Sequence, residues 1–258
     1  IFFLRYLFAI FFVSISLFLT IPMFFNYEKK EGLIKDYFIK AYNFRISEYD
    51  EIKYKAFPFP RLELKKAQIN FIKSNTNLNV SNLKIYPKIL SIYNLNNFEV
   101  SKIILNENVA NLEIVNLSIF IDQLFSQKKK IYFNNLDLKI SSQNKLLFTL
   151  ENLVLANFGH KKNSIKGKIF GKKFKVELGN NLQSIKFKIL KSGISASLDF
   201  DKKKKGTGTL KSKILNTNLK LNFEYDKEKI KILNSYYRSK NLSFKHESLI
   251  TFIPFQTI

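Results

Sequence analysis

Residues 136–155, LDLKISSQNKLLFTLENLVL, indicate the fold class of this chain. Apolar residues stand at every second position on both sides of the polar sequence 141–144, namely Leu136, Leu138 and Ile140 before it and Leu146, Phe148 and Leu150 after it. A period of two is typical of a strand with one buried and one solvated face. The stretch therefore predicts two β-strands joined by a turn.

The same alternation extends outward from this stretch in both directions. It predicts further strands over residues 62–71, 78–85, 112–121, 153–155, 174–178, 185–189, 198–200 and 219–225. A one-residue slip between Leu64 and Ala67 predicts a bulge. We interpret Asn134-Asn135, Gly171, and residues 179–181 and 201–206 as turns between strands. Short strands separated by polar turns indicate a mainly β body.

Helical spacing occurs in only a few places. Apolar residues in LIKDYFIKAYNFR, residues 33–45, recur at helical intervals and predict a short amphipathic helix. We expect this helix to pack on the body; the alternative is that it lies on the membrane headgroups. Residues 86–93 and 119–125 are each compatible with a short helical turn after a strand.

The N-terminus predicts a membrane anchor. From Tyr6 to Phe25 twenty residues carry no charge, and at ~1.5 Å per residue such a helix spans ~30 Å, the hydrocarbon thickness of a bilayer. A cleaved signal peptide is the rival interpretation, but bulky Met23-Phe24-Phe25 stands where small residues would precede a cleavage site. The flanking charges do not determine the orientation, because Arg5 is the only charge before the span.

Composition excludes several function classes. The chain has no Cys and only two His, so thiol chemistry and Cys- or His-based metal sites are disfavoured, and we expect no cofactor. The net charge is +23, yet only four of the 43 basic residues are arginine. An excess of Lys, Asn and Ile is what an A/T-rich coding sequence produces, so we expect no nucleic-acid partner. The chain lacks an initiator Met and ends at Thr257-Ile258, and we expect it to be truncated at the C-terminus.

Local motifs do not point to catalysis. His160 lies in a Gly-His-Lys-Lys turn without a nucleophile motif, and His246 is equally isolated. Asp199 and Asp201 share one strand face, but four lysines follow them directly, which is typical of a charged hairpin. We therefore expect a protein that is not an enzyme.

The order of features resembles that of the AsmA-like proteins of Gram-negative envelopes. A single span and a short helix are followed by Phe57-Pro58-Phe59-Pro60-Arg61-Leu62-Glu63-Leu64, which is similar to that family's first strand. Residues 82–91 leading into Phe98-Glu99-Val100, and residues 116–125 leading into Ile131-Tyr132-Phe133, resemble two copies of a strand, an apolar step and a strand. The likeness covers roughly residues 1–140, and the remainder only by its strand pattern.

The resemblance implies a particular division and location of the chain. It implies a transmembrane anchor at 1–27, a juxtamembrane segment with a short helix at 28–56 and a β-rich groove domain at 57–258. The fold expected is mainly β, in which the two helices precede a long, curved antiparallel sheet that forms a groove. An inner-membrane location with the body in the periplasm also follows from the likeness, as does a part in phospholipid transport or outer-membrane biogenesis, like that of relatives such as TamB.

The function depends on what covers the apolar face of the sheet. We expect no helix layer there, which leaves two hypotheses: a groove that binds acyl chains of membrane phospholipid, or a closed β-sandwich that is a scaffold for other envelope proteins. The predicted groove lining is Leu62, Leu64, Ile69, Leu83, Ile85, Phe98, Val100, Leu117, Ile119, Leu136, Leu138, Phe148, Leu150, Phe174, Val176, Phe187 and Ile189.

Overall fold

A long apolar helix stands at one end of the molecule. The computed structural model describes residues 2–179, 183–201, 206–226, 228–252 and 255–257. Helix α1 (Phe2–Thr20) continues into the 3-10 turn η1 (Ile21–Phe24), and the side chains of both are mostly exposed. Together Phe3–Phe24 form a segment of 22 residues with a mean hydropathy of 2.4, long and apolar enough to cross a membrane. The predicted membrane-spanning capacity is confirmed.

The predicted amphipathic helix is also present, and it packs on the body. After the turn η2 (Glu28–Lys30), helix α2 (Glu31–Tyr42) buries Ile34, Phe38 and Tyr42, which are four residues apart and share one helix face. Asn43 ends the helix in the left-handed conformation at φ 55°, an arrangement that asparagine tolerates well. The helix is therefore shorter than residues 33–45, and strand β1 begins two residues after it.

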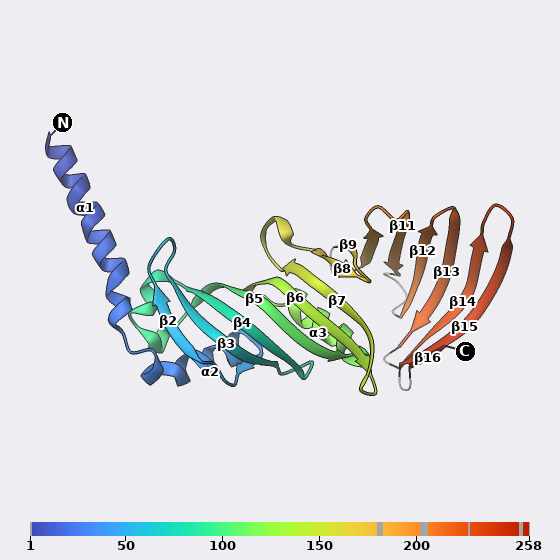
Figure 1. Cartoon of the computed structure of the whole chain (residues 1–258), viewed down its shortest axis with the longest axis horizontal. Helices are drawn as coiled ribbons and strands as arrows, with labels where there is room; N and C mark the ends of the chain where they lie inside the picture. Colours follow the sequence, from blue (N-terminus) through green and yellow to red (C-terminus); the bar gives the residue numbers. More distant parts are fainter. Residues whose placement is uncertain (1, 180–182, 202–205, 227, 253–254, 258) are drawn as a thin grey trace.

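The described residues form one sheet of sixteen strands. Its strands are β1 (Phe44–Ile46), β2 (Glu51–Lys55), β3 (Arg61–Phe71), β4 (Thr76–Pro87), β5 (Val100–Glu113), β6 (Lys130–Ser142), β7 (Lys145–Ala156), β8 (Ser164–Ile169), β9 (Lys172–Leu178), β10 (Ser184–Ile189), β11 (Ile194–Phe200), β12 (Thr207–Ile214), β13 (Thr217–Tyr225), β14 (Lys229–Arg238), β15 (Ser243–Phe252) and β16 (Phe255–Thr257). From β3 onward the strands lie side by side in chain order, while β1 and β2 both pair with β3. The sheet is open and curved, and it extends from α1 to the opposite end of the molecule (Figure 1).

This architecture confirms the mainly β fold class and corrects it in two respects. The sheet begins at Phe44, inside the segment expected to be juxtamembrane, because β1 and β2 pair with β3. One neighbouring pair is parallel: β5 and β6 run in the same direction and are joined by the turn η5 (Ile114–Asn116) and helix α3 (Leu117–Phe125). A parallel pair needs such a crossover, and a helix commonly supplies it. The strand predicted over 112–121 is therefore wrong beyond Glu113, whereas the helical turn at 119–125 is confirmed.

A line of bulges crosses the covered half of the sheet. Lys66, Glu107, Asn135 and Asn152 have positive φ values between 47° and 61°. The register aligns the first three in one line across β3 to β6, with Ser81 of β4 between Lys66 and Glu107. The bulge predicted between Leu64 and Ala67 is confirmed at Lys66. Asn134-Asn135 is not a turn between strands, because β6 runs through it; asparagine supplies the left-handed residue that a bulge requires.

The other predicted turns divide into two groups. Gln143-Asn144 and Phe170-Gly171 are tight turns between neighbouring strands, and both residues of each turn have positive φ, as in the favoured hairpin turn types. The turns at 179–181 and 201–206 lie partly outside the described residues. The 3-10 turn η3 (Ile89–Ile92) confirms the helical turn expected at 86–93, and a second turn, η4 (Leu95–Asn97), follows it.

Candidate functional site

One face of the sheet is apolar from the first strands to the last. Directly paired residues share a face, so the register identifies a row that crosses thirteen strands. The row consists of Leu64, Leu83, Leu105, Phe133, Leu155, Ile165, Val176, Phe187, Ala196, Ser212, Leu219, Tyr237 and Phe244. Ser212 and the hydroxyl of Tyr237 are the polar groups in this row, and the Ser212 hydroxyl donates to the carbonyl of Ser195 at 3.0 Å. A continuous apolar surface of this length is the first candidate site.

Helices cover the first half of this face. Phe38 of α2 stacks on Phe44 at 5.1 Å between ring centroids, and Phe120 of α3 meets Phe71 edge-on at 5.4 Å. The two helices are joined to each other by the side-chain amide of Gln123, which donates to the Asn43 carbonyl at 2.9 Å. The expectation that no helix layer exists is therefore wrong for β1 to β6, because the short patterns at 31–42 and 117–125 are enough to cover these strands.

No comparable cover lies over the second half of the face in the described ranges. Strands β8 to β16 make extensive contacts only with their neighbours in the sheet. Most apolar side chains of this half are only partly buried, as Ile165, Val176 and Phe187 illustrate, whereas Phe174, Leu178 and Phe223 are buried. Partly exposed apolar side chains in a continuous area are typical of a binding surface rather than of a closed core.

The structure divides the predicted groove lining into three sets. The residues buried in the covered half are Leu62, Leu64, Ile69, Leu83, Ile85, Phe98, Val100, Leu136 and Leu138, and Phe174 is buried on β9 in the open half. Leu117 and Ile119 lie on helix α3 instead of a strand, which corrects their predicted place. The half-buried residues, which remain available to a ligand, are Phe148, Leu150, Val176, Phe187 and Ile189.

Sequence reasoning omitted several residues of the open surface. Ile165 lies opposite Val176, and Tyr237 stacks on Phe244 with a centroid separation of 4.6 Å. The alternation in SIKGKI, residues 164–169, signals Ile165 from the sequence alone. Tyr237 and Phe244 follow a register shift in β14, which no local pattern reveals.

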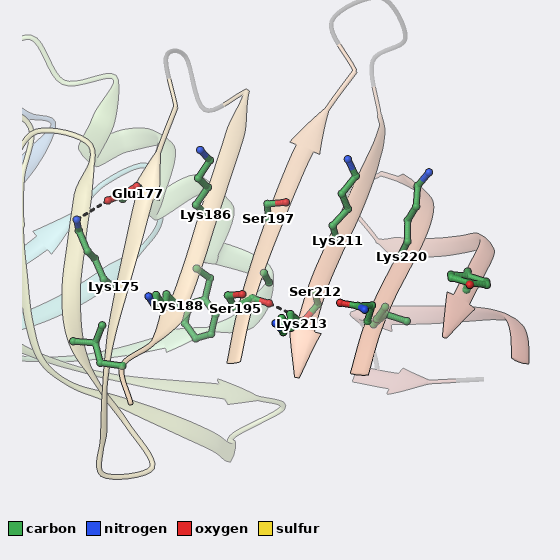
Figure 2. A pocket seen from close by; sticks show the side chains of 16 residues that line it. Lys175, Glu177, Lys186, Lys188, Ser195, Ser197, Lys211, Ser212, Lys213 and Lys220 are labelled. Atoms are coloured by element: carbon green, nitrogen blue, oxygen red, sulfur yellow. Dashed lines mark hydrogen bonds and ion pairs between the residues drawn. The ribbon is translucent and has the colours of Figure 1, made fainter. Parts of the chain in front are cut away.

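The opposite face of the same strands carries lysines around a shallow cavity of about 830 Å³. Figure 2 shows Lys186, Lys211 and Lys220 pointing in the same direction from three strands. The cavity has a single carboxylate in its lining, Glu177, whose pKa is lowered by a hydrogen bond from Lys175 at 2.5 Å. Lys211 and Lys220 are direct cross-strand partners, so like charges face each other here. This face is solvated and strongly positive.

The base of α1 is attached to the sheet by tyrosines. Tyr54 donates its hydroxyl to the Leu19 carbonyl at 2.9 Å, and Tyr93 donates to the Phe18 carbonyl while its ring stacks on Phe18 at 4.7 Å. Burial raises the pKa values of Tyr27 and Tyr54, which also stack on each other. Aromatic residues with polar tips are typical of the membrane–water boundary. The end of α1 is thus fixed to the body rather than connected by a free linker.

The polar residues singled out in the sequence do not converge. Asp199 pairs with Thr209 and Ser184, while His160 lies in a turn and His246 in β15, both exposed. Among the described residues no group of three or more His, Asp or Glu side chains is placed to hold a metal ion.

Neither a family model nor a curated protein matches the chain. What can be said about function therefore comes from the geometry: a sheet with a helix-covered half, an open apolar half, a lysine-rich opposite face and a membrane-capable helix fixed to one end.

Proposed function

We propose that the open apolar face of β8–β15 binds the acyl chains of membrane phospholipid, and that α1 holds the protein at the membrane that supplies them. One observation carries the proposal: the apolar row passes from strands with helical cover to strands that have no such cover in the described ranges. Burial of methylene groups contributes ~0.8 kcal/mol each and needs no specific polar partner, so a polar site is not required.

The wider role that we propose is support of phospholipid transport or outer-membrane biogenesis, from the inner membrane with the body in the periplasm. The resemblance of residues 1–140 to AsmA-like proteins motivates this assignment. The alternative, a scaffold for other envelope proteins, was linked to a closed β-sandwich, whereas the described strands form a single open sheet. Protease accessibility of the body in spheroplasts tests the location.

A photo-cross-linking experiment on the full chain tests acyl binding. We replace Phe187 with benzoyl-phenylalanine, and make the same replacement at Lys186, the preceding residue, which lines the lysine-rich face. The two variants share α1 and its surrounding lipid, so annular lipid affects both equally. We expect phospholipid adducts, identified by mass spectrometry, at position 187 and not at 186. Equal adduct yields at the two positions would contradict the proposal.

A second variant distinguishes loss of binding from loss of folding. Phe187→Asp places a charge on the open face, where it reduces bound lipid and leaves the strand content intact, as measured by circular dichroism. Collapse of the whole β-signal in this variant would indicate that Phe187 belongs to a closed core, contrary to the proposal.

A further inference from the structure

Large apolar residues project from the hairpin turns along one edge of the sheet. The four successive turns that join β8 to β9, β10 to β11, β12 to β13 and β14 to β15 contain Phe170, Leu190, Leu215 and Leu242, respectively, all exposed. By contrast, the sequences between β11 and β12 and between β13 and β14 are polar, with DKKKKG at 201–206 and DKE at 226–228. Hairpin turns normally favour Asn, Asp and Gly. Because a leucine or phenylalanine stands at each of these four turns instead, we infer that the exposed side chains contact a ligand or a surface.

Two of these residues occupy an unfavourable backbone conformation. Phe170 has φ 48° and Leu215 has φ 54°, in the left-handed region that bulky side chains rarely adopt. Tight hairpin turns favour this region, but Asn, Asp and Gly adopt it with less strain than leucine or phenylalanine, so these two turns retain bulky side chains at some cost in backbone strain. Leu215 additionally lies beside Gly193 of the neighbouring turn, whose carbonyl accepts its backbone N–H at 3.3 Å, so the two turns form one surface.

The turns of β10–β15 lie on the side of the sheet toward which α1 rises. In Figure 1 the hairpins β10–β11, β12–β13 and β14–β15 point upward, as does α1, and the loop between β2 and β3 rises next to α1 in the same direction. That loop exposes Phe57 and Phe59 and is held by Arg61, which donates to both of their carbonyls, at 3.0 and 3.2 Å. Apolar groups are therefore presented on the α1 side at both ends of the molecule.

Basic residues accompany the apolar turns. Lys191 follows Leu190, Lys213 precedes the Ile214-Leu215 turn, and Lys240 precedes Leu242, and all three lysines are exposed. Apolar side chains flanked by lysine are typical of segments that lie in the interface of a membrane with anionic lipids. A protein partner fits less well, because lysine is depleted in protein–protein interfaces.

We propose that the hairpin turns of β10–β15 insert into the same membrane surface that α1 crosses, so that the sheet lies along that membrane instead of projecting away from it. The lipid surface contacts the Phe57–Phe59 loop at one end and Leu190, Leu215 and Leu242 at the other. The inference rests on membrane insertion of α1 but not on acyl binding by the open face.

Depth measurement on the full chain in vesicles tests this arrangement. The chain has no Cys, so single cysteines at Leu215, Leu242 or Leu146 accept an environment-sensitive dye without background. Leu146, 61% exposed against 65% for Leu215, is the matched control. It lies next to the β6–β7 turn, which points away from α1 in Figure 1. The vesicles contain phosphatidylcholine with phosphatidylglycerol as the minor lipid, and lipids brominated on the acyl chain quench the dye.

We expect strong quenching at positions 215 and 242, at an interfacial depth of ~5–10 Å, and little at position 146. Quenching at positions 215 and 242 that is no greater than at position 146 would overturn the proposal. It would also be overturned if a second copy of the chain shielded the dye in detergent while brominated lipid failed to quench it in vesicles. In a further variant, Leu215→Lys with Leu242→Lys, quenching of a dye at Leu190→Cys should fall, and unchanged quenching would also count against it. Cross-linking at Phe187 is independent of these results, so failure of either proposal is recognised separately.

Discussion

Truncation of one phenylalanine in each half of the apolar face should separate the covered half from the open half. Phe71 is 1% exposed, and its ring lies 5.5 Å from that of Phe44, 5.4 Å from that of Phe120 and 6.3 Å from that of Phe133. Phe71→Ala leaves a cavity between the sheet and α3. Such replacements in packed cores cost about 3–5 kcal/mol, and every 1.4 kcal/mol is a factor of ten. The protection of nearby backbone amides from hydrogen exchange should therefore fall by about two to four orders of magnitude.

The same truncation in the open half should cost far less. Phe187 is half-buried, and the aromatic ring beside it, that of Phe174, lies at 5.8 Å. Full burial of a phenylalanine contributes ~1.5–3 kcal/mol, so half of that, about 1 kcal/mol, corresponds to about a fivefold loss of protection. Phe170→Ala, at a turn residue that is 80% exposed, should change protection hardly at all and is the control.

Hydrogen exchange of the full chain in micelles measures both effects locally. Peptides from β3 and β4 report on Phe71→Ala, and peptides from β9 and β10 report on Phe187→Ala. Local opening of each group of strands is therefore measured separately, even if the whole sheet does not unfold at once. Protection in β9 and β10 that fell as far as that in β3 and β4 would refute the reasoning, because it would show that Phe187 is packed as tightly as a core residue.

Three further variants test local features. Glu63 is buried, which opposes its ionisation, but hydrogen bonds from Lys55 and Arg61 hold the pKa of its carboxyl below the ordinary value. The ionised carboxylate therefore stabilises the fold above the unfolded pKa of ~4.3, and this stabilisation is lost as the pH falls through the lower folded pKa. Glu63→Gln should accordingly flatten the acid branch of a curve of unfolding free energy against pH. At Gly208 a Cβ would lie 2.4 Å from the ring of the opposing phenylalanine, so Gly208→Ala should lower stability by ~1–3 kcal/mol in chemical denaturation, whereas Gly32→Ala on α2, with open space around it, should not. Lys211→Glu, directly opposite Lys220, should raise stability by about 0.2–1 kcal/mol and should do so less at high salt; an unchanged or lower midpoint would contradict the like-charge argument.

Local patterns predicted many of the strands, but they missed others, such as β5, β12 and β14, and they did not reveal what covers the sheet. The alternation around Leu136 and Leu150 predicted strands correctly, and the uncharged run from Tyr6 predicted the long apolar helix. The parallel crossover was missed because LSIFIDQLF alternates at its start and has helical spacing only when read as a whole. Cover of the sheet depends on contacts such as the one between Phe71 and Phe120, which are far apart in sequence, and no local period encodes them.

Several asparagines have a structural role in the sheet. They lie along the bulge line, whatever the origin of their abundance in the chain. The side-chain amide of Asn134 donates to that of Asn106 at 3.1 Å, and the backbone N–H of Asn152 donates to Asp137 at 2.8 Å. Asparagine is suited to this line because it tolerates left-handed φ values and hydrogen-bonds to neighbouring backbone.

The bulge line and the helical cover occur in the same strands, and we infer a physical connection between them. Bulges bend a strand and increase its twist, so aligned bulges from β3 to β7 curve that part of the sheet as a unit. A curved face surrounds a helix more completely than a flat one, which is consistent with the near-complete burial of Phe38 and Phe120 there. Beyond β7 the bulge line ends and no described helix covers the face. The lysines solvate the opposite face of these strands and disfavour stacking of a second sheet there, because approach would bring like charges together. They leave the apolar face of the described strands uncovered. An open apolar face can thus persist in a folded chain, and this is the condition that binding of acyl chains requires.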